Sequence, residues 1–376
     1  MSLTRRSFVG ASMVAAAAAM SGAALSGCSG SAGTAASEKK EEAVQEFMTK
    51  GKGQKLVCGR RGKLFKIAPS VIAEELGYYK EEGCDVEFQI VELAEAFASL
   101  STGNLDLMLM GVVQTCEYIA KGTPMYIIGG TVLNGTEILA KEDFAAKLEK
   151  PEDFKGFNIG FHRPETGQMV LRAWLKNAGL DIDGKDVTFT PLDDEQSLVQ
   201  ATLKGEVDFC MCNNAFGYVN RNNGIKVVGT VKDLCGDYPC CRQNASEKAF
   251  KEKYLSLVDF EIALLRGYKV FKTDPDTAVP IMVKYSKQPE DFVRAGLYGT
   301  DDYEAVMNLS PDPCRTAVIA FYEDLKAVEA IEDGAPAVEE FVSVDVYRTA
   351  LDTLMEREPE EQFWKDLDAA FAKNNA

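Results

Sequence analysis

Short apolar runs alternate with longer amphipathic stretches along the chain from Leu56 onward. The runs LVCG, DVEFQIV, LDLMLMG and PMYIIGGTV are separated by helix-like segments such as APSVIAEELGYYKEEG. After a charged stretch the alternation resumes, with the apolar runs FNIGF, VTFTPL, VDFCMC and IKVVGTV. Alternation of this kind predicts parallel sheets with crossover helices. Beyond Cys241 the pattern is mainly helical to the end of the chain.

A local repeat links the two halves of this pattern. FASLSTGNLDLMLMG and VQATLKGEVDFCMCN both run from a helix-like segment through Gly to an Asp that opens an apolar run, so that Gly103 and Asp106 correspond to Gly205 and Asp208. Gly at a helix end can adopt the left-handed conformation, and Asp suits the tight turn before a strand. The repeat predicts two similar lobes, with a ligand in a cleft beyond the carboxyl ends of their strands.

The N-terminal segment TRRSFVGASMVAAAAAMSGAALSGC is typical of a signal peptide, with two arginines, a short Ala-rich middle and small residues before Cys28. It is too weakly apolar for a membrane-spanning helix. The paired arginines are similar to a twin-arginine signal, and LSGC is similar to a bacterial lipobox. We therefore expect residues 1–27 to be removed and Cys28 to be lipidated. Residues 28–53 would then tether an extracytoplasmic protein to the cell membrane. A general secretory signal with an incidental cysteine is the alternative.

Charge and cysteine usage narrow the choice of partners. The chain has 58 Asp and Glu against 41 Lys and Arg, for a formal net charge of −17, which argues against nucleic-acid binding. Most cysteines beyond Cys28 lie in apolar contexts, where a free cysteine behaves as a small core residue. His162 is the only histidine and there is no repeated CxxC, so we predict no metal site and no cofactor.

Five segments, in their order and spacing, resemble a known family. VIAEELGYYKEEGCDVEF, LSTGNLDLMLMG, IAKGTPMYIIGG, PEDFKGFNIGF and ATLKGEVDFCMC are similar to the extracytoplasmic solute-binding proteins of ABC importers, in the branch of sulfonate, nitrate, taurine and thiamine-precursor binders. The resemblance implies an α/β fold of the type II periplasmic-binding-protein class, with two lobes and a helical C-terminal region. Each lobe would be a mainly parallel sheet flanked by helices. We assign residues 54–137 and 236–376 to lobe 1, and residues 138–235 to lobe 2.

The same resemblance implies how the protein acts. One small-molecule ligand would be closed between the lobes and delivered to an ABC permease with its ATPase. We expect a monomer that is a binding protein and not an enzyme. Because a cleft can be locally basic on an acidic protein, the net charge does not exclude an anionic ligand.

Loops that follow the apolar runs supply the candidate ligand contacts. Arg163 is the leading candidate, because a guanidinium group can bind a carboxylate, sulfonate or phosphate in bidentate geometry. Thr166 and Gly167 beside it open a helix whose free N–H groups suit an anionic oxygen. Gln114 and Thr115 in GVVQTCEY can bind a polar ligand or cap their helix.

Two further loops face the predicted cleft. Arg60 and Lys63 in CGRRGKLFKIAP can meet an anion or only solvent. In CNNAFGY, one of Asn213 and Asn214 is expected to cap a helix and the other to reach the ligand, whereas Phe216 can stack on an aromatic ligand or belong to the core. The predicted ligand-binding residues are Arg60, Lys63, Phe65, Gly111, Gln114, Thr115, Asn134, Arg163, Thr166, Gly167, Gln168, Asn213, Asn214, Phe216 and Tyr238.

The stretch DYPCCRQ keeps a second hypothesis open. Adjacent cysteines can close only a small strained ring, so a disulfide between Cys240 and Cys241 would be easily reduced. A cysteine-rich segment is also found in the yeast-type thiamine pyrimidine synthases, enzymes of this fold, but those have three adjacent cysteines. We predict a hinge loop lined by Tyr238 and Cys240. The predicted function is capture of a small organic anion of the sulfonate or carboxylate kind; a synthase-like enzyme or a pyrimidine binder is the alternative.

Overall fold

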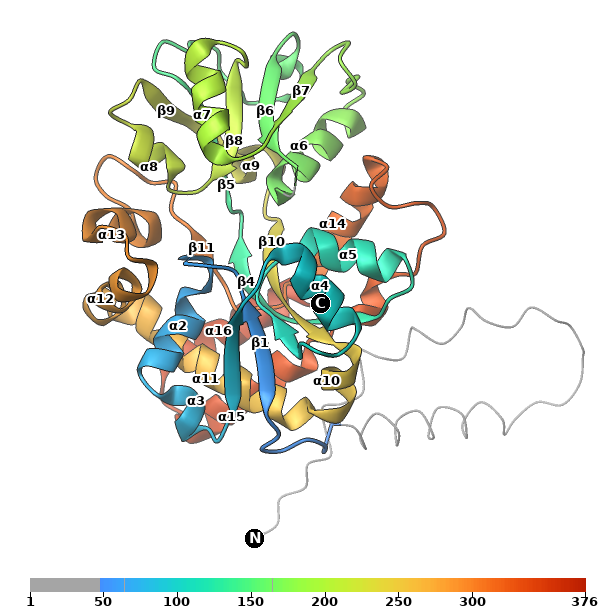
Figure 1. The fold of residues 1–376 in the computed structure, drawn as a ribbon, viewed down its shortest axis with the longest axis vertical. Coiled ribbons are helices and arrows are strands. Elements are labelled where there is room, and N and C mark those ends of the chain that lie inside the picture. Colours follow the sequence, from blue (N-terminus) through green and yellow to red (C-terminus); the bar gives the residue numbers. More distant parts are fainter. Residues whose placement is uncertain (1–47, 64, 164) are drawn as a thin grey trace, which may run out of the picture. The chain divides into compact units, whose positions relative to one another are not determined.

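Two sheets organise the part of the chain that the structure describes. The computed structural model describes residues 48–63, 65–163 and 165–376. The first sheet has the strand order β11-β4-β10-β3-β1-β2 (Figure 1). Its strands are β1 (Leu56–Arg60), β2 (Val86–Ile90), β3 (Leu107–Met108), β4 (Met125–Leu133), β10 (Pro239–Ser246) and β11 (Asn308–Leu309).

The second sheet is built from the middle of the chain, in the order β7-β6-β8-β5-β9. Its strands are β5 (Thr136–Lys141), β6 (Asn158–His162), β7 (Thr188–Leu192), β8 (Phe209–Asn213) and β9 (Ile225–Thr230). Helices flank both sheets, which confirms the predicted α/β fold class.

The strand directions add a feature that the apolar runs did not predict. β1 pairs in parallel with β2 and β3, and β6 pairs in parallel with β7 and β8, as expected. However, β10 lies antiparallel between β3 and β4, and β5 lies antiparallel between β8 and β9. Each of these two strands enters its sheet from the other sheet, so it starts at the edge where the parallel strands end and must run in the opposite direction. β11 also lies antiparallel to β4. Both sheets are therefore mixed, with four parallel and five antiparallel pairings among the described strands, where the sequence predicted mainly parallel sheets.

The helices that accompany the two sheets are short, and the longer ones follow β10. Those within the sheet-forming region are α2 (Ala68–Glu75), α3 (Tyr78–Glu81), α4 (Leu93–Ser101), α5 (Val112–Ala120), α6 (Thr166–Asn177), α7 (Glu195–Lys204), α8 (Phe216–Asn220) and α9 (Val231–Cys235), with the 3-10 helices η2 (Phe65–Ile67) and η3 (Pro151–Phe154). Those that follow are α10 (Glu247–Glu252), α11 (Tyr254–Thr273), α12 (Pro275–Ser286), α13 (Glu290–Tyr298), α14 (Arg315–Ala327), η4 (Val338–Phe341), α15 (Asp345–Arg357) and α16 (Gln362–Asn374).

Helix α11 is the central helix of the C-terminal region. It packs on α2 and on α15, and most of its residues are buried. Gly267 allows the close approach to α2, because a Cβ at this position would lie 2.2 Å from the carbonyl oxygen of Pro69. Among the helices that the structure describes, α11 included, none is both long enough and apolar enough to cross a membrane.

The local repeat has the same structural role in both sheets. Gly103 and Gly205 adopt the left-handed conformation at the ends of α4 and α7. Asp106 then accepts a hydrogen bond from the N–H of Val57 at 2.8 Å, and Asp208 accepts one from the N–H of Asn158 at 2.7 Å. Each aspartate therefore fixes the start of its strand against the neighbouring parallel strand.

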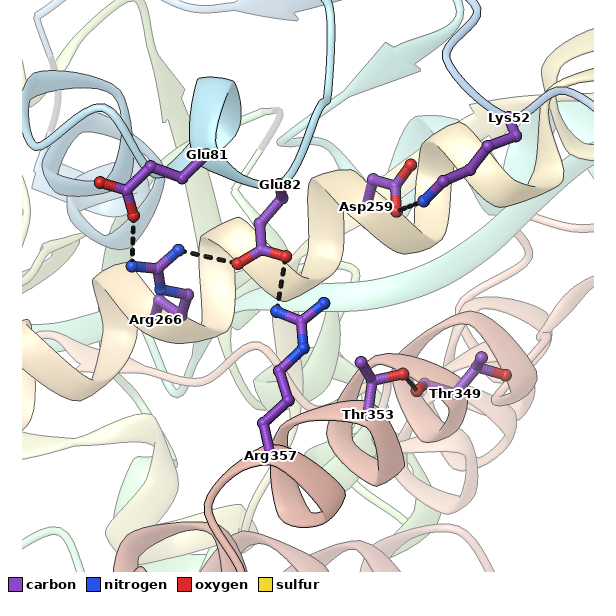
Figure 2. A network of polar contacts seen from close by, with 8 residues as sticks. All are labelled: Lys52, Glu81, Glu82, Asp259, Arg266, Thr349, Thr353 and Arg357. Carbon is purple, nitrogen blue, oxygen red and sulfur yellow. Dashed lines mark hydrogen bonds and ion pairs between the residues drawn. The ribbon is translucent and has the colours of Figure 1, made fainter. Parts of the chain in front are cut away.

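A network of charged side chains ties the C-terminal helices to the first βα unit (Figure 2). Glu82, at the end of α3, accepts hydrogen bonds from Arg266 on α11 and from Arg357 on α15, each at 2.7 Å. Arg266 also pairs with Glu81 at 2.6 Å. The side chain of Glu82 is only 6% exposed, so the two arginines supply the polar contacts that this buried carboxylate needs.

The N-terminal predictions fall mostly on residues that the structure does not describe. The signal segment, Cys28 and most of the predicted tether lie outside the described residues. The last residues of the tether are described and contact the folded part: Ser256 donates a hydrogen bond to the carbonyl of Gly51 at 2.5 Å, and Lys52 pairs with Asp259. The folded part therefore begins within the range predicted as tether.

Candidate functional site

The edges at which the two sheets face each other bring together a set of polar side chains that are buried or, for Asn213, half-buried. The site includes residues that follow β1, residues that follow β6 and the last residue of β8. It also includes residues at the start of β10, the strand next to β3 in the first sheet. Carboxyl ends of strands are where α/β proteins bind ligands. We call this set the junction cluster; it consists of Lys66, Glu165, Asn213, Tyr238, Cys240 and Cys241.

Lys66 is the cation of the junction cluster. It lies in η2 between Phe65 and Ile67 and is 8% exposed. Its ammonium group donates a hydrogen bond to Asn213, whose amide in turn donates to Glu195 at the start of α7. Burial lowers the pKa of Lys66, but the negative groups of Cys240, Cys241, Glu165 and Glu195 outweigh burial, and the pKa is raised. Lys66 is therefore a buried positive charge that links the two sheets.

Glu165 is the acid of the junction cluster. It is the N-cap residue of α6, but its side chain does not cap that helix. Burial raises its pKa to about 7, even though Lys66 and a hydrogen bond from Asn213 lower it. Near neutral pH this carboxyl group can therefore be either protonated or charged.

Cys240 and Cys241 point toward each other across an irregular part of β10. The pairing of β10 with β4 shifts register on both sides of Cys241, and this brings the two sulfur atoms to 3.8 Å instead of placing them on opposite faces. The hydrogen bond from Cys240 lowers the pKa of Cys241 against the effect of burial, and Lys66 and the N–H of Gly111 lower it further. The junction cluster therefore contains a thiol with thiolate character next to a lysine.

Several buried polar atoms around the junction cluster have no hydrogen-bond partner. They include Glu165 Oε2 and Gln168 Oε1. Tyr238 Oη and Thr136 Oγ1 lie near each other, but neither makes a hydrogen bond of good geometry. Buried polar groups without partners are rare and costly, so each calls for an explanation such as a bound molecule. A cavity of about 10 Å³ also touches Lys66, but its other lining residues, such as Pro69 and Leu264, lie outside the junction cluster.

Some of the predicted ligand-binding residues lie in or beside the junction cluster. Asn213 and Tyr238 belong to it, and Gly111 contributes its N–H to Cys241. Thr166 donates a hydrogen bond to the carbonyl of Cys240 at 3.2 Å. Gly167 and Gln168, which follow Thr166 on α6, are also buried.

Other predicted residues are engaged elsewhere in the protein. Arg60 is 2% exposed, pairs with Glu74, donates to Ser70 at 2.9 Å and lies over the ring of Phe88. Because these contacts occupy its guanidinium group, Arg60 is a structural residue of the first sheet. Lys63 is exposed.

Three more predicted residues make contacts within the protein. Phe65 packs on the ring of Phe292. Thr115 donates to Asn244 at 2.7 Å. Asn134, in the left-handed conformation, donates to Asp237 at 2.6 Å. Asn134 also accepts a hydrogen bond from the N–H of Tyr238 at 2.8 Å, beside the junction cluster. The side chains of Phe65 and Thr115 support neighbouring elements of the protein.

The remaining predicted residues lie near the ends of β3, β6 and β8. Gln114 is half-buried beside Gly111. Asn214 donates to two backbone carbonyls at 2.9 Å each, and Phe216 packs against the apolar core of the second sheet. Arg163 is exposed and lines a different cavity, between α6 and β7. The leading sequence-based candidate is thus placed outside the junction cluster.

Sequence reasoning missed Lys66, Glu165 and Cys241 as site residues. Lys66 is a basic residue six positions after β1, which could have marked it as a candidate. Arg60 and Lys63 are basic residues of the same segment, so nothing in the sequence favoured Lys66 over them. Within the described residues, no group of three or more His, Cys, Asp or Glu side chains is arranged to hold a metal ion.

Comparisons with solved structures show the same fold. The aliphatic sulphonate binding protein SsuA from Escherichia coli is 16% identical, with a TM-score of 0.61 over 77% of this chain and 92% of that one. The nitrate-binding protein NrtA from Synechocystis PCC 6803 is 15% identical, with a TM-score of 0.64 over 80% of this chain and 89% of that one. A DSZB mutant in complex with biphenyl-2-sulfinic acid is 11% identical, with a TM-score of 0.58 over 80% and 99%.

The sequence itself matches one family. A search of curated protein sequences found no match. The model of the NMT1/THI5-like family matches residues 65–278, which is more than half of the chain. This range includes every member of the junction cluster, and it confirms the resemblance found from the sequence segments. The chain belongs to the NMT1/THI5-like family.

Proposed function

We propose that this protein is the solute-binding component of an ABC importer and that it binds a small organic acid at the junction cluster. The observation that carries the proposal is the set of buried polar atoms without partners where the two sheets meet. A solute that bridges these atoms would supply the missing hydrogen bonds. The fold shared with sulfonate- and nitrate-binding proteins supports a binding function of this kind.

Opening of the junction is part of the proposal. Lys66, Glu165 and Tyr238 are buried, so the lobes (54–137 with 236–376, and 138–235) would separate to admit an organic solute. The segments that join β4 to β5 and α9 to β10 are the natural hinges, because they connect the two sheets. A solute that contacts both sheets would then favour the closed state, since it binds that state more tightly.

The charges of the junction cluster favour a solute with one acidic group. Lys66 is the cation, and the start of α6 offers backbone N–H groups that no side chain caps. Glu165 would oppose an anion when charged and would donate a hydrogen bond to it when protonated. Binding of a carboxylate or sulfonate should therefore strengthen as the pH falls through about 7. A neutral pyrimidine that donates to Glu165 would show the opposite dependence.

A catalytic function is the second candidate, and Cys241 is the observation that favours it. A thiol whose pKa is lowered, next to a lysine and an acid, is a common arrangement at active sites. The DSZB mutant, which shares the fold, is in complex with an aromatic sulfinic acid. Turnover of any solute by the purified protein, observed by mass spectrometry, would replace the binding proposal with this one.

The N-terminal sequence supports a proposal for the location, and the family supports one for the partners. We propose that Cys28 is lipidated, after export by the twin-arginine or the general secretory route. The mature protein would be a monomer on the outer side of the cell membrane, and it would deliver its solute to a permease with its ATPase. No cofactor is required for this function.

A solute screen with one matched pair of variants tests the proposal. Sulfonates, carboxylates, nitrate and pyrimidines are screened by thermal shift and then by calorimetry. At 100 times its Kd, a solute adds roughly 2.7 kcal/mol of stability, which corresponds to about 3–4 °C in a protein of this size. Lys66→Met should weaken binding about 10- to 100-fold, whereas Lys63→Met, at an exposed lysine of the same loop, should not. Equal affinity of the two variants would exclude the junction cluster as the binding site.

A further inference from the structure

A second cavity, of about 360 Å³, lies between α6 and β7. β7 is the edge strand of the second sheet, so this cavity is open along one side. Its lining includes Phe161, Arg163, Arg172, Ile182 and Phe189, and no residue of the junction cluster. Its volume is within the range of small-molecule sites. We call it the arginine groove.

The two arginines of the groove differ from the other arginines that the structure describes. Arg163 and Arg172 are the only ones in the described residues whose guanidinium groups have neither a hydrogen bond nor an ion pair; Arg163 is engaged only through its backbone carbonyl. Exposed arginines such as Arg294 have acidic partners. The chain has 58 acidic against 41 basic residues, so acidic partners for arginine are plentiful. Two guanidinium groups that line one cavity without such a partner make that cavity locally positive.

Arg172 carries the second observation. Its Nε is buried without a hydrogen-bond partner, which is costly for a charged group. Its guanidinium carbon lies 5.4 Å from the centre of the Phe189 ring, and Phe189 packs edge to face with Phe161 at 6.1 Å. Because the ring holds Arg172 from one side without satisfying its N–H groups, those groups are left to bind a ligand.

We propose that the arginine groove is a second binding site, which takes a small monoanionic organic acid with an apolar body. Its carboxylate or sulfonate group would be bound by Arg163 and Arg172, and its apolar part would pack against Phe161 and Ile182. Asp183 also lines the groove, so two positive groups face one negative group. This balance fits a single negative charge better than a phosphate dianion. The site is separate from the one at the junction cluster.

Binding of benzoate and of benzenesulfonate, with inorganic phosphate as the comparison, tests this proposal. Calorimetry on the full folded protein should show saturable binding of at least one organic probe, tighter than that of phosphate. Arg172→Gln should weaken this binding about 10- to 100-fold. Arg163→Gln should also weaken it, and it provides a variant at an exposed position that should not disturb folding. Arg294→Gln, at an arginine outside the groove, should leave the affinity unchanged.

The variants also separate this site from the junction cluster. Lys66→Met should leave binding of the probes in the groove unchanged. If Lys66→Met abolishes probe binding while both groove variants keep it, the probes occupy the junction cluster and the proposed groove site is wrong, although the proposed function is supported. Absence of saturable binding by either organic probe, or binding that survives both groove substitutions, would equally overturn the proposal.

Discussion

Replacing Gly167 by alanine tests whether the start of α6 must lie directly against the crossing strand β5. A Cβ at Gly167 would be 2.3 Å from Thr136 Oγ1 and 2.6 Å from Thr136 Cβ. Thr136 is fully buried at the first residue of β5, so it cannot move aside without moving the strand. Overpacking of this kind costs about 1–3 kcal/mol. Alanine in a helix gains at most about 1 kcal/mol over glycine, so the clash should win.

The consequence for the site should be larger than the loss of stability. Glu165 precedes Gly167 by two residues, and a shift of α6 away from Thr136 moves Glu165 relative to Lys66. We expect Gly167→Ala to lower the free energy of unfolding in urea by about 1–2 kcal/mol and to weaken solute binding at least tenfold, since misplacement by about 1 Å is costly at a preorganised site.

Two further variants make the Gly167 experiment decisive. Gly229→Ala on β9 is the matched control, because a Cβ there meets no atom within 4 Å, and it should change neither quantity. Thr136→Gly combined with Gly167→Ala removes all three atoms nearest to the new Cβ and should restore the position of α6. If Gly167→Ala is as stable as Gly229→Ala, the start of α6 does not need to lie directly against Thr136.

Three more predictions concern charge and anchoring. Burial raises the pKa of Glu165 from 4.5 to about 7. Between these pH values the native state binds more protons than the unfolded state, so the stability of the protein falls as the pH rises through this range. Glu165→Gln should remove this part of the pH dependence, as measured by urea unfolding from pH 4.5 to 8. Glu82→Gln should lower the free energy of unfolding by about 1–2 kcal/mol, because two arginines lose a buried carboxylate. Glu81→Gln, at a side chain that is 57% exposed, should lower it by less than half as much. Equal losses for the two variants would contradict the role of burial. Cys28→Ser should prevent lipidation and release the protein from membranes, as measured by intact mass and fractionation; a wild-type protein with an unmodified N-terminus would end this assignment.

The fold could be predicted because its signals are local. Apolar runs of strand length, separated by amphipathic stretches, indicate βα units wherever they occur. The turn from Gly103 to Asp106 and that from Gly205 to Asp208 each need only a left-handed glycine and an aspartate that reaches one neighbouring strand. Such features do not depend on the rest of the chain, so the sequence alone indicates them.

The site could be predicted only in part, because its side chains come together through long-range contacts. Lys66 and Asn213 are 147 residues apart, and nothing local distinguishes Lys66 from Lys63 until η2 turns one of them inward. The irregular pairing that places Cys240 and Cys241 on the same side depends on the insertion of β10 between β3 and β4. Arg163 follows β6 as expected, but only the packing of α6 on the second sheet decides which cavity it lines.

The most direct test of the central claim is the affinity of Tyr238→Phe for the solute, measured by calorimetry. The solute is the one that co-purifies with the protein, identified by native mass spectrometry, or otherwise the first one found in the screen. The hydroxyl of Tyr238 is buried without a hydrogen bond of good geometry in the protein, so its removal should leave the melting temperature almost unchanged. Tyr347→Phe removes a buried hydroxyl without a partner from α15, far along the chain from the junction cluster, and serves as the control. If the solute binds at the junction cluster, Tyr238→Phe should weaken binding about 5- to 10-fold, as loss of a hydrogen bond of about 1 kcal/mol or slightly more predicts, and Tyr347→Phe should not. Affinities within twofold of the wild type for both variants would contradict the account.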